Sequence, residues 1–180
     1  MNRLAMSAAL AALLISPAVM AQSMGEKTGV NSALGIAPTT ADFVKEAASS
    51  DMLEIEAAKI AEEKGNAEEK KFAAQMITDH TKTSSDLKQL VSSGDVKADI
   101  PASLDAASQK KLDKLRDAKP ADFTGEYDPM QVSAHEDAVS LFERYAKSGD
   151  SIKLKDWAGK TLPALQHHLD MAKAMNKSRD

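Results

Sequence analysis

Gly65 and Asn66 interrupt a long stretch of helical hydrophobic periodicity, and this short break constrains the fold more than any other feature of the chain. The pattern predicts one helix from about Ala41 to Lys64, with Thr40 as its N-cap. A second helix is predicted from the capping Asn66 to about Ser93. Because so short a linker forces consecutive helices to lie beside each other, we expect an antiparallel hairpin.

A long connection, residues 94–125, follows this hairpin. Ile100 precedes Pro101 and is therefore disfavoured in a helix. A short helix is expected from about Ala106 to Asp117, and the segment after it, 119–129, is expected to be a loop.

A second long hairpin is predicted in the C-terminal half. Its first helix is expected to begin between Thr124 and Pro129, with Asp128 as a candidate N-cap, and to end near Lys147. Its second helix, with Asp150 as N-cap, is expected to reach about Met175. Proline inside a helix removes one backbone hydrogen bond, so Pro163 is expected to kink it.

The chain shows no strand-like alternation and no internal repeat. Four long helices in two hairpins, joined by one long crossover that contains a short extra helix, are typical of a ferritin-like four-helix bundle. We therefore predict an all-α domain over residues 40–176.

The N-terminus has the pattern of a secretory signal peptide. Arg3 supplies the positive charge, Leu4–Ile15 is an apolar run, and small residues precede a cleavage site after Ala21. The alternative to a cleaved signal peptide is that this apolar run stays on the chain as an uncleaved anchor. Residues 22–39 lack periodicity and are expected to be a flexible leader. Because of the signal peptide, the mature chain is predicted to be periplasmic or secreted.

Composition narrows the classes of function. The chain has no cysteine, which excludes disulfides and thiolate metal ligands. Its formal net charge of −4 comes from interspersed charges, without a basic patch of the kind that binds nucleic acid. No segment after the N-terminal run has the ~20 apolar residues of a membrane span.

Polar residues occur at one position in the apolar stripe of each long helix. Three of the four histidines and one glutamate share this placement, and within each hairpin they lie at similar depth; the set is Glu54, His80, His135 and His168. Imidazole and carboxylate ligands suit a divalent ion such as Zn, Fe or Cu. Asp79 and Gln131 are candidate hydrogen-bond partners that would orient the ligand rings.

A metal-free explanation is also open. Buried polar groups are normally hydrogen-bonded, and an unsatisfied one costs ~1–3 kcal/mol, so the four side chains could instead form a polar network with one another or with water. Both interpretations predict that the four groups converge.

A di-iron centre of the ferritin type needs a glutamate three residues before a histidine on each of two helices. The corresponding positions here hold Ile77, Val132 and Leu165, so any metal should be mononuclear. No phosphate-binding loop or nucleophile motif is present, and an enzymatic role would need an open metal position.

Several motifs also follow one another in a characteristic order. They are Asp79-His80, Ile100-Pro101, Phe123 to Tyr127 followed by His135, and Leu162-Pro163 followed by His168-Leu169. In these motifs residues 40–175 resemble a bacterial family of exported ferritin-like domains of unknown function, often labelled putative outer membrane or membrane proteins. Thr124 replaces the aspartate usual in that family.

The resemblance implies the ferritin-like bundle and no established activity. Together with the polar residues it favours an exported metal-binding domain, with a role in envelope stress or metal handling. A metal-free structural or interaction module of the cell envelope is the alternative, and the sequence names no protein partner.

Overall fold

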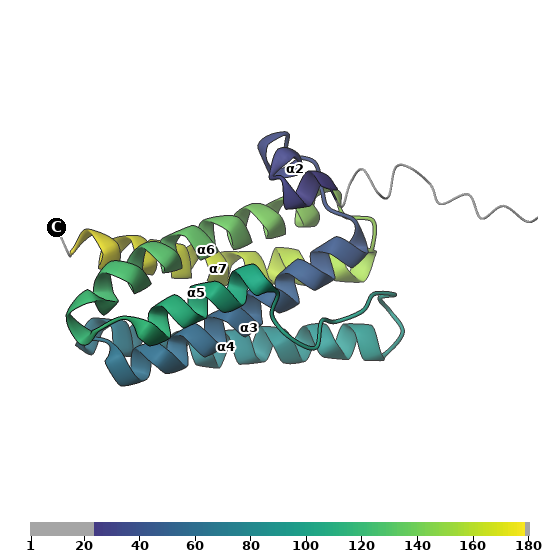
Figure 1. The fold of residues 1–180 in the computed structure, drawn as a ribbon. Helices are drawn as coiled ribbons and strands as arrows, with labels where there is room; N and C mark the ends of the chain where they lie inside the picture. Colours follow the sequence, from purple (N-terminus) through teal and green to yellow (C-terminus); the bar gives the residue numbers. More distant parts are fainter. Residues whose placement is uncertain (1–23, 179–180) are drawn as a thin grey trace, which may run out of the picture.

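The computed structural model describes residues 24–178, which form helices and connecting turns without a β-strand. Four long helices lie side by side as a helical bundle (Figure 1). They are α3 (Thr40–Lys64), α4 (Ala67–Ser92), α6 (Pro120–Ser148) and α7 (Ile152–Lys177). Along the chain, the short helix α5 (Ala106–Asp117) follows α4 and precedes α6, and α2 (Val30–Ala33) precedes α3. The all-helical prediction is therefore confirmed.

Local capping explains the first hairpin, α3 and α4. The Asn66 side chain accepts hydrogen bonds from the backbone N–H groups of Glu68 and Glu69, and the Glu69 carboxylate accepts from the Asn66 N–H at 2.6 Å. This reciprocal capping box starts α4 at the predicted residue. A Cβ at Gly65 would lie 2.6 Å from the Ala61 carbonyl oxygen, so the close turn requires glycine.

The start of α6 corrects a prediction. The segment expected to be a loop is helical, because α6 begins at Pro120, and Pro129 lies inside the helix instead of at its first turn. Pro120 at the first position removes only an N–H that would have no helical partner. Phe123 and Tyr127, both 0% exposed, extend the buried stripe of α6 by two turns. Their burial outweighs the backbone bond that Pro129 removes.

Two N-caps also differ from prediction. Thr39 caps α3, accepting from the Asp42 N–H at 3.1 Å, and Ser151 caps α7 instead of Asp150. The Asp150 carboxylate accepts hydrogen bonds from the hydroxyls of Thr40 and Tyr145. Asp150 thus links the two hairpins, which a local capping rule does not anticipate.

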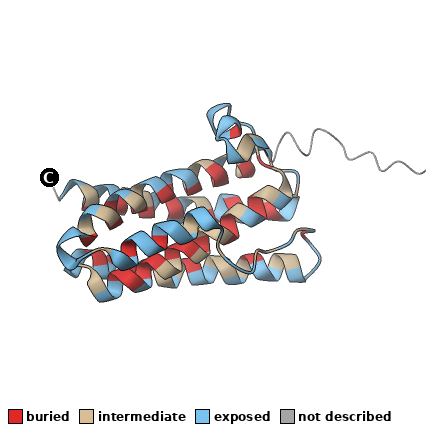
Figure 2. Cartoon of the chain, viewed as in Figure 1, coloured by how far each residue is buried: buried red, intermediate tan, exposed pale blue. Residues whose placement is uncertain are grey.

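Buried residues lie along the long helices (Figure 2), and the apolar ones among them form two clusters. One contains Phe72, Tyr127 and Ala172, and the other contains Phe43, Leu87 and Leu165. Along the four long helices a buried polar layer separates them, and its members are Asp51, Glu54, His80, Gln131, His135 and His168. The candidate site therefore lies in the middle of the bundle, closed off by apolar side chains on both sides.

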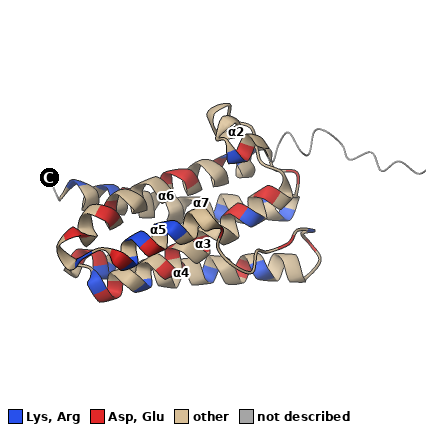
Figure 3. Ribbon diagram, in the orientation of Figure 1, with Lys and Arg blue, Asp and Glu red and all other residues tan. Residues whose placement is uncertain are grey.

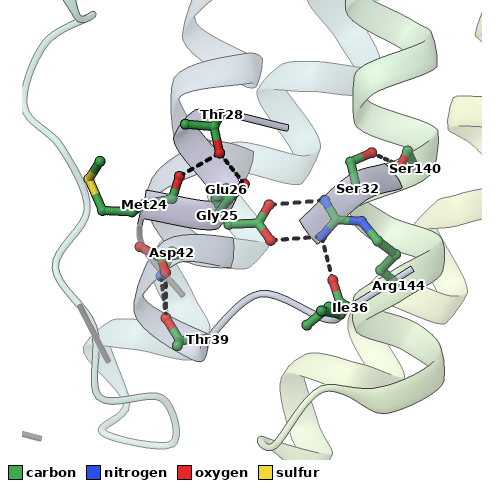
Figure 4. Close-up of polar contacts among 10 residues, drawn as sticks. All are labelled: Met24, Gly25, Glu26, Thr28, Ser32, Ile36, Thr39, Asp42, Ser140 and Arg144. Carbon is green, nitrogen blue, oxygen red and sulfur yellow. Dashed lines mark hydrogen bonds and ion pairs between the residues drawn. The ribbon is translucent and has the colours of Figure 1, made fainter. Parts of the chain in front are cut away.

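The described part of the expected leader is packed against the bundle. The Glu26 carboxylate pairs with both terminal nitrogens of Arg144 on α6, at 2.8 and 3.0 Å, and Arg144 also donates to the Ile36 carbonyl at 2.6 Å (Figure 4). The Ser32 and Ser140 hydroxyls are 2.9 Å apart. Residues 24–36 are thus held by contacts with partners far along the chain, which is why local periodicity does not predict them.

Charged residues of both signs alternate along the outer faces of the helices (Figure 3). Within residues 24–178, no helix is both long and apolar enough to cross a membrane. The predicted signal peptide, residues 1–21, lies outside the described residues.

Candidate metal centre

Three histidines from three different helices meet in the polar layer. His80 on α4, His135 on α6 and His168 on α7 are each at most 2% exposed, and one ring nitrogen of each lies within 4.8 Å of the others. The three ring centroids are 5.6 to 5.8 Å apart, which makes the triangle nearly equilateral. Ligand nitrogens around a tetrahedral zinc ion lie ~3.4 Å apart, since bonds of ~2.1 Å meet there. Small side-chain adjustments would bring these nitrogens to that spacing.

His80 is oriented from outside the triangle by Asp51 of α3. The Asp51 Oδ1 accepts a hydrogen bond from His80 Nδ1 at 2.8 Å. Asp51 also accepts from the Thr83 and Ser84 hydroxyls, at 2.9 and 3.1 Å. Burial acts to lower the pKa of His80, but the hydrogen bond and charge of Asp51, with the charge of Glu54, raise it above its ordinary value.

His135 is oriented by its own helix. Its Nδ1 donates to the backbone carbonyl of Gln131, one turn earlier, at 2.9 Å. Burial lowers the pKa of His135, and the charge of Glu54 opposes that effect. The neutral ring, which is the form that binds a metal, is therefore favoured at this position.

His168 is oriented by Asp79 of α4. Its Nε2 donates to the Asp79 carboxylate at 2.8 Å, and Asp79 also accepts from the Gln75 amide at 2.6 Å. Burial lowers the pKa of His168 to about 4, although the Asp79 hydrogen bond acts to raise it. Asp79, which was predicted to orient a ligand ring, does so for His168 and not for the adjacent His80, because consecutive helix residues point about 100° apart.

The inner nitrogens of the triangle have no partner among the described residues. They are His80 Nε2, His135 Nε2 and His168 Nδ1, and all are buried. Because each outer nitrogen donates its hydrogen to an oxygen, each neutral ring carries a lone pair on its inner nitrogen. Three buried acceptors without a donor would be costly, at ~1–3 kcal/mol each, so they need a common partner. A metal ion is such a partner, and outer hydrogen bonds of this kind are typical of metal-bound histidines.

Glu54 lies near the triangle without belonging to it. The residue is 0% exposed, and neither carboxylate oxygen has a partner among residues 24–178. Its charge acts to raise the pKa values of both His80 and His135. Its oxygens are not among the atoms that lie within 4.8 Å of one another. Three of the four predicted ligands are thus brought together, and Glu54 supplies a negative charge beside them.

Gln131 and Tyr127 complete the polar surroundings. Gln131 was expected to orient His135 through its side chain, but the backbone carbonyl does so. Both side-chain amide atoms of Gln131, and the Tyr127 hydroxyl, are buried without a partner among the described residues. Burial, and next the charge of Glu54, raise the pKa of Tyr127 well above its ordinary value.

Sequence reasoning missed Asp51 and Tyr127. Helical spacing carried a signal for both, since Asp51 lies one turn before Glu54 on the same face of α3, and Tyr127 lies two turns before His135 on α6. Asp51 was not connected with a ligand because its partner, His80, lies on another helix.

The chemistry of the three donors suits borderline divalent metals. Neutral imidazoles favour Zn, Fe, Cu or Ni over Mg and Ca, which prefer oxygen ligands. The cluster contains one triangle of donors, with no second set of ligands beside it in the described chain.

Comparison with known proteins adds a family and no activity. The family model described as Domain of unknown function (DUF4142) matches residues 25–175. No match to the chain was found among curated proteins or solved structures.

Proposed function

The chain belongs to the DUF4142 family, whose function is unknown, and we propose that it is an exported ferritin-like domain that binds one divalent metal ion in its core. The ligands are His80 Nε2, His135 Nε2 and His168 Nδ1, with the Glu54 carboxylate as the fourth protein ligand or as a charge partner beside the ion. The ion is Zn, Fe or Cu.

One observation carries this proposal. Three buried ring nitrogens from three helices lie within 4.8 Å of one another, and each is left as an acceptor by a hydrogen bond at the opposite side of its ring. A network of protein groups alone would need a donor within hydrogen-bond distance of these three nitrogens, and none of them has such a partner among the described residues.

The negative charges around the site support the choice of a cation. Asp51 and Asp79 contact the outer faces of two rings, and Glu54 lies buried beside the triangle. A carboxylate behind a ligating histidine strengthens the ring as a donor. An ion of charge +2 would compensate the uncompensated charge of Glu54, which is otherwise expensive to bury.

The ferritin-like and export parts of the proposal have separate support. The two hairpins, with α5 in the long connection between them, match the connectivity of that bundle class. Export is supported by the N-terminal pattern, Arg3 followed by Leu4–Ile15 and a cleavage site after Ala21. A core metal site in an exported domain suits metal handling or envelope stress tolerance.

Metal analysis of tag-free protein, comprising residues 22–180, tests the proposal. The wild type should bind one Zn, Fe(II) or Cu(II) per chain, and the metal should raise the melting temperature of chelator-treated protein by mass action. The His80→Ala, His168→Ala double variant should lose both effects.

His167→Ala is the matched control, because His167 adjoins His168 in sequence but is exposed. It should bind metal as the wild type does. If the wild type carries no metal and none of the three metals raises its melting temperature, the metal proposal is wrong, and the metal-free polar core is what remains.

A further inference from the structure

Unpartnered polar groups continue along α6 from the histidine triangle. Gln131 lies one turn before His135, and Tyr127 lies one turn before Gln131. Both side chains are 0% exposed, yet the Gln131 amide and the Tyr127 hydroxyl have no hydrogen-bond partner among the described residues. Buried amides and hydroxyls are normally hydrogen-bonded, so these groups need a partner other than the protein groups of residues 24–178.

Glu54 shares this region. Its charge acts on Tyr127, His80 and His135, so the carboxylate lies close to all three. Glu54, Tyr127 and Gln131 form what we call the inner polar cluster. All its side-chain oxygens and nitrogens are buried and unpartnered within the described chain.

Phe72 shows that the inner polar cluster adjoins the triangle. Its ring lies edge-on to Tyr127, with centroids 6.4 Å apart, and edge-on to His135, with centroids 6.0 Å apart. Phe72 of α4 thus contacts both Tyr127 and His135, and Gln131 lies between these two residues in α6. The inner polar cluster and the triangle are therefore neighbours in the core, packed against the same Phe72 ring.

We propose that the inner polar cluster holds an exchangeable, non-protein ligand of the metal, a water molecule or a small monoanion. This inference rests on the metal binding proposed above. Three histidines leave coordination positions of a divalent ion open. Tyr127 and Gln131 each offer a donor to a lone pair of the bound ligand, and Glu54 offers an acceptor to a proton of bound water.

Charge also favours a monoanion over a dianion. A divalent ion, three neutral imidazoles and the Glu54 carboxylate have a net charge of about +1, and the Asp51 and Asp79 carboxylates behind two of the rings bring the total to about −1. A dianion would therefore be repelled more strongly than a small monoanion. Solvent reaches the neighbourhood of the triangle at Asp79, whose side chain is 31% exposed while its hydrogen-bond partner His168 is 3% exposed.

Cobalt substitution provides the test, because the visible absorption of Co(II) responds to its ligands. Residues 22–180 are stripped with a chelator, loaded with Co(II) and titrated with azide as the probe anion. Azide should change the Co(II) spectrum of the wild type with saturation. Tyr127→Phe and Gln131→Leu should retain Co(II), but each should weaken azide binding by about 2- to 12-fold, the value of one lost hydrogen bond.

Tyr145→Phe is the control, since Tyr145 is also a buried tyrosine of α6 but its hydroxyl bonds Thr40 and Asp150 in the other half of the core. Its azide affinity should equal that of the wild type. If Co(II) binds and azide leaves the wild-type spectrum unchanged, the position is closed and this inference is overturned while the metal site stands. Equal azide affinities in all variants would also overturn it. Absence of Co(II) binding would instead remove the proposed function itself.

Discussion

The Asp51 carboxylate on α3 accepts a hydrogen bond from His80 Nδ1 on α4, at 2.8 Å, across the first hairpin. This bond occupies one nitrogen of the His80 ring, and the other, Nε2, is buried without a partner among the described residues. Because Asp51 is also held by two hydroxyls of α4, Thr83 and Ser84, the histidine ring has a rigid support. The support makes Asp51 a sensitive position for testing the metal site.

Replacing Asp51 with asparagine should lower metal affinity by about 10- to 100-fold, because the ring loses a charged partner that orients it and increases its basicity. Competition with a chromophoric chelator measures the affinity. Asp86→Asn is the control, since Asp86 is a partly exposed aspartate of α4 that pairs with Lys82. Equal affinities for the two variants would show that Asp51 does not support a ligand.

Replacing Glu54 with glutamine should have opposite effects with and without metal. In chelator-treated protein, removing a buried carboxylate without a partner should raise the free energy of unfolding by about 1–2 kcal/mol. With Zn(II) added, the variant should show a smaller rise in melting temperature than the wild type. Denaturation of both proteins in both states gives the four values. A loss of stability in the metal-free variant would contradict the metal proposal and favour a protein network around Glu54.

Replacing Arg144 with methionine should release residues 24–36 from α6. The pair it forms with Glu26 is largely buried, with side chains 9% and 4% exposed, and a buried partner left alone is strongly unfavourable. Hydrogen exchange should show protection lost in residues 24–36 and retained in α7. In the control Arg116→Met, which removes an exposed pair with Asp113, protection should not change. Uniform loss over the whole bundle would show that Arg144 supports the core rather than the segment.

Stability should depend on pH through Glu46. Burial, followed by the charges of Glu26 and Asp42, raises the pKa of Glu46 from 4.5 to about 7. A carboxyl group whose pKa is raised by folding contributes stability that is complete below about pH 4.5 and is lost as the pH rises to about 7.

The Glu46→Gln variant should therefore lose less stability than the wild type between pH 5 and pH 8. The difference should be about 1–2 kcal/mol, less than the full shift implies because Glu46 is partly exposed to solvent. Urea denaturation at several pH values measures it, and Glu56→Gln on the same helix is the control for removing a surface carboxylate. Parallel pH profiles for Glu46→Gln and the wild type would contradict the assignment.

The sequence by itself determined which side of each long helix is buried. Hydrophobic periodicity assigned Glu54, His80, His135 and His168 to the buried stripes, and all four are buried. Gly65 and Asn66 determined the first turn, because a capping box and a close glycine contact depend on neighbours in the sequence. These features are local, so one helix at a time is enough to predict them.

Only the tertiary structure decided which of these groups meet. It paired Asp51 with His80 and Asp79 with His168, and it joined Glu26 to Arg144, all through contacts between segments far apart in the chain. It also extended α6 through Pro129, since the burial of Phe123 and Tyr127 against other helices exceeds the loss of one backbone hydrogen bond. Helical phase determines the direction of a side chain, but its partner depends on the height and rotation of the neighbouring helix, which no local pattern contains.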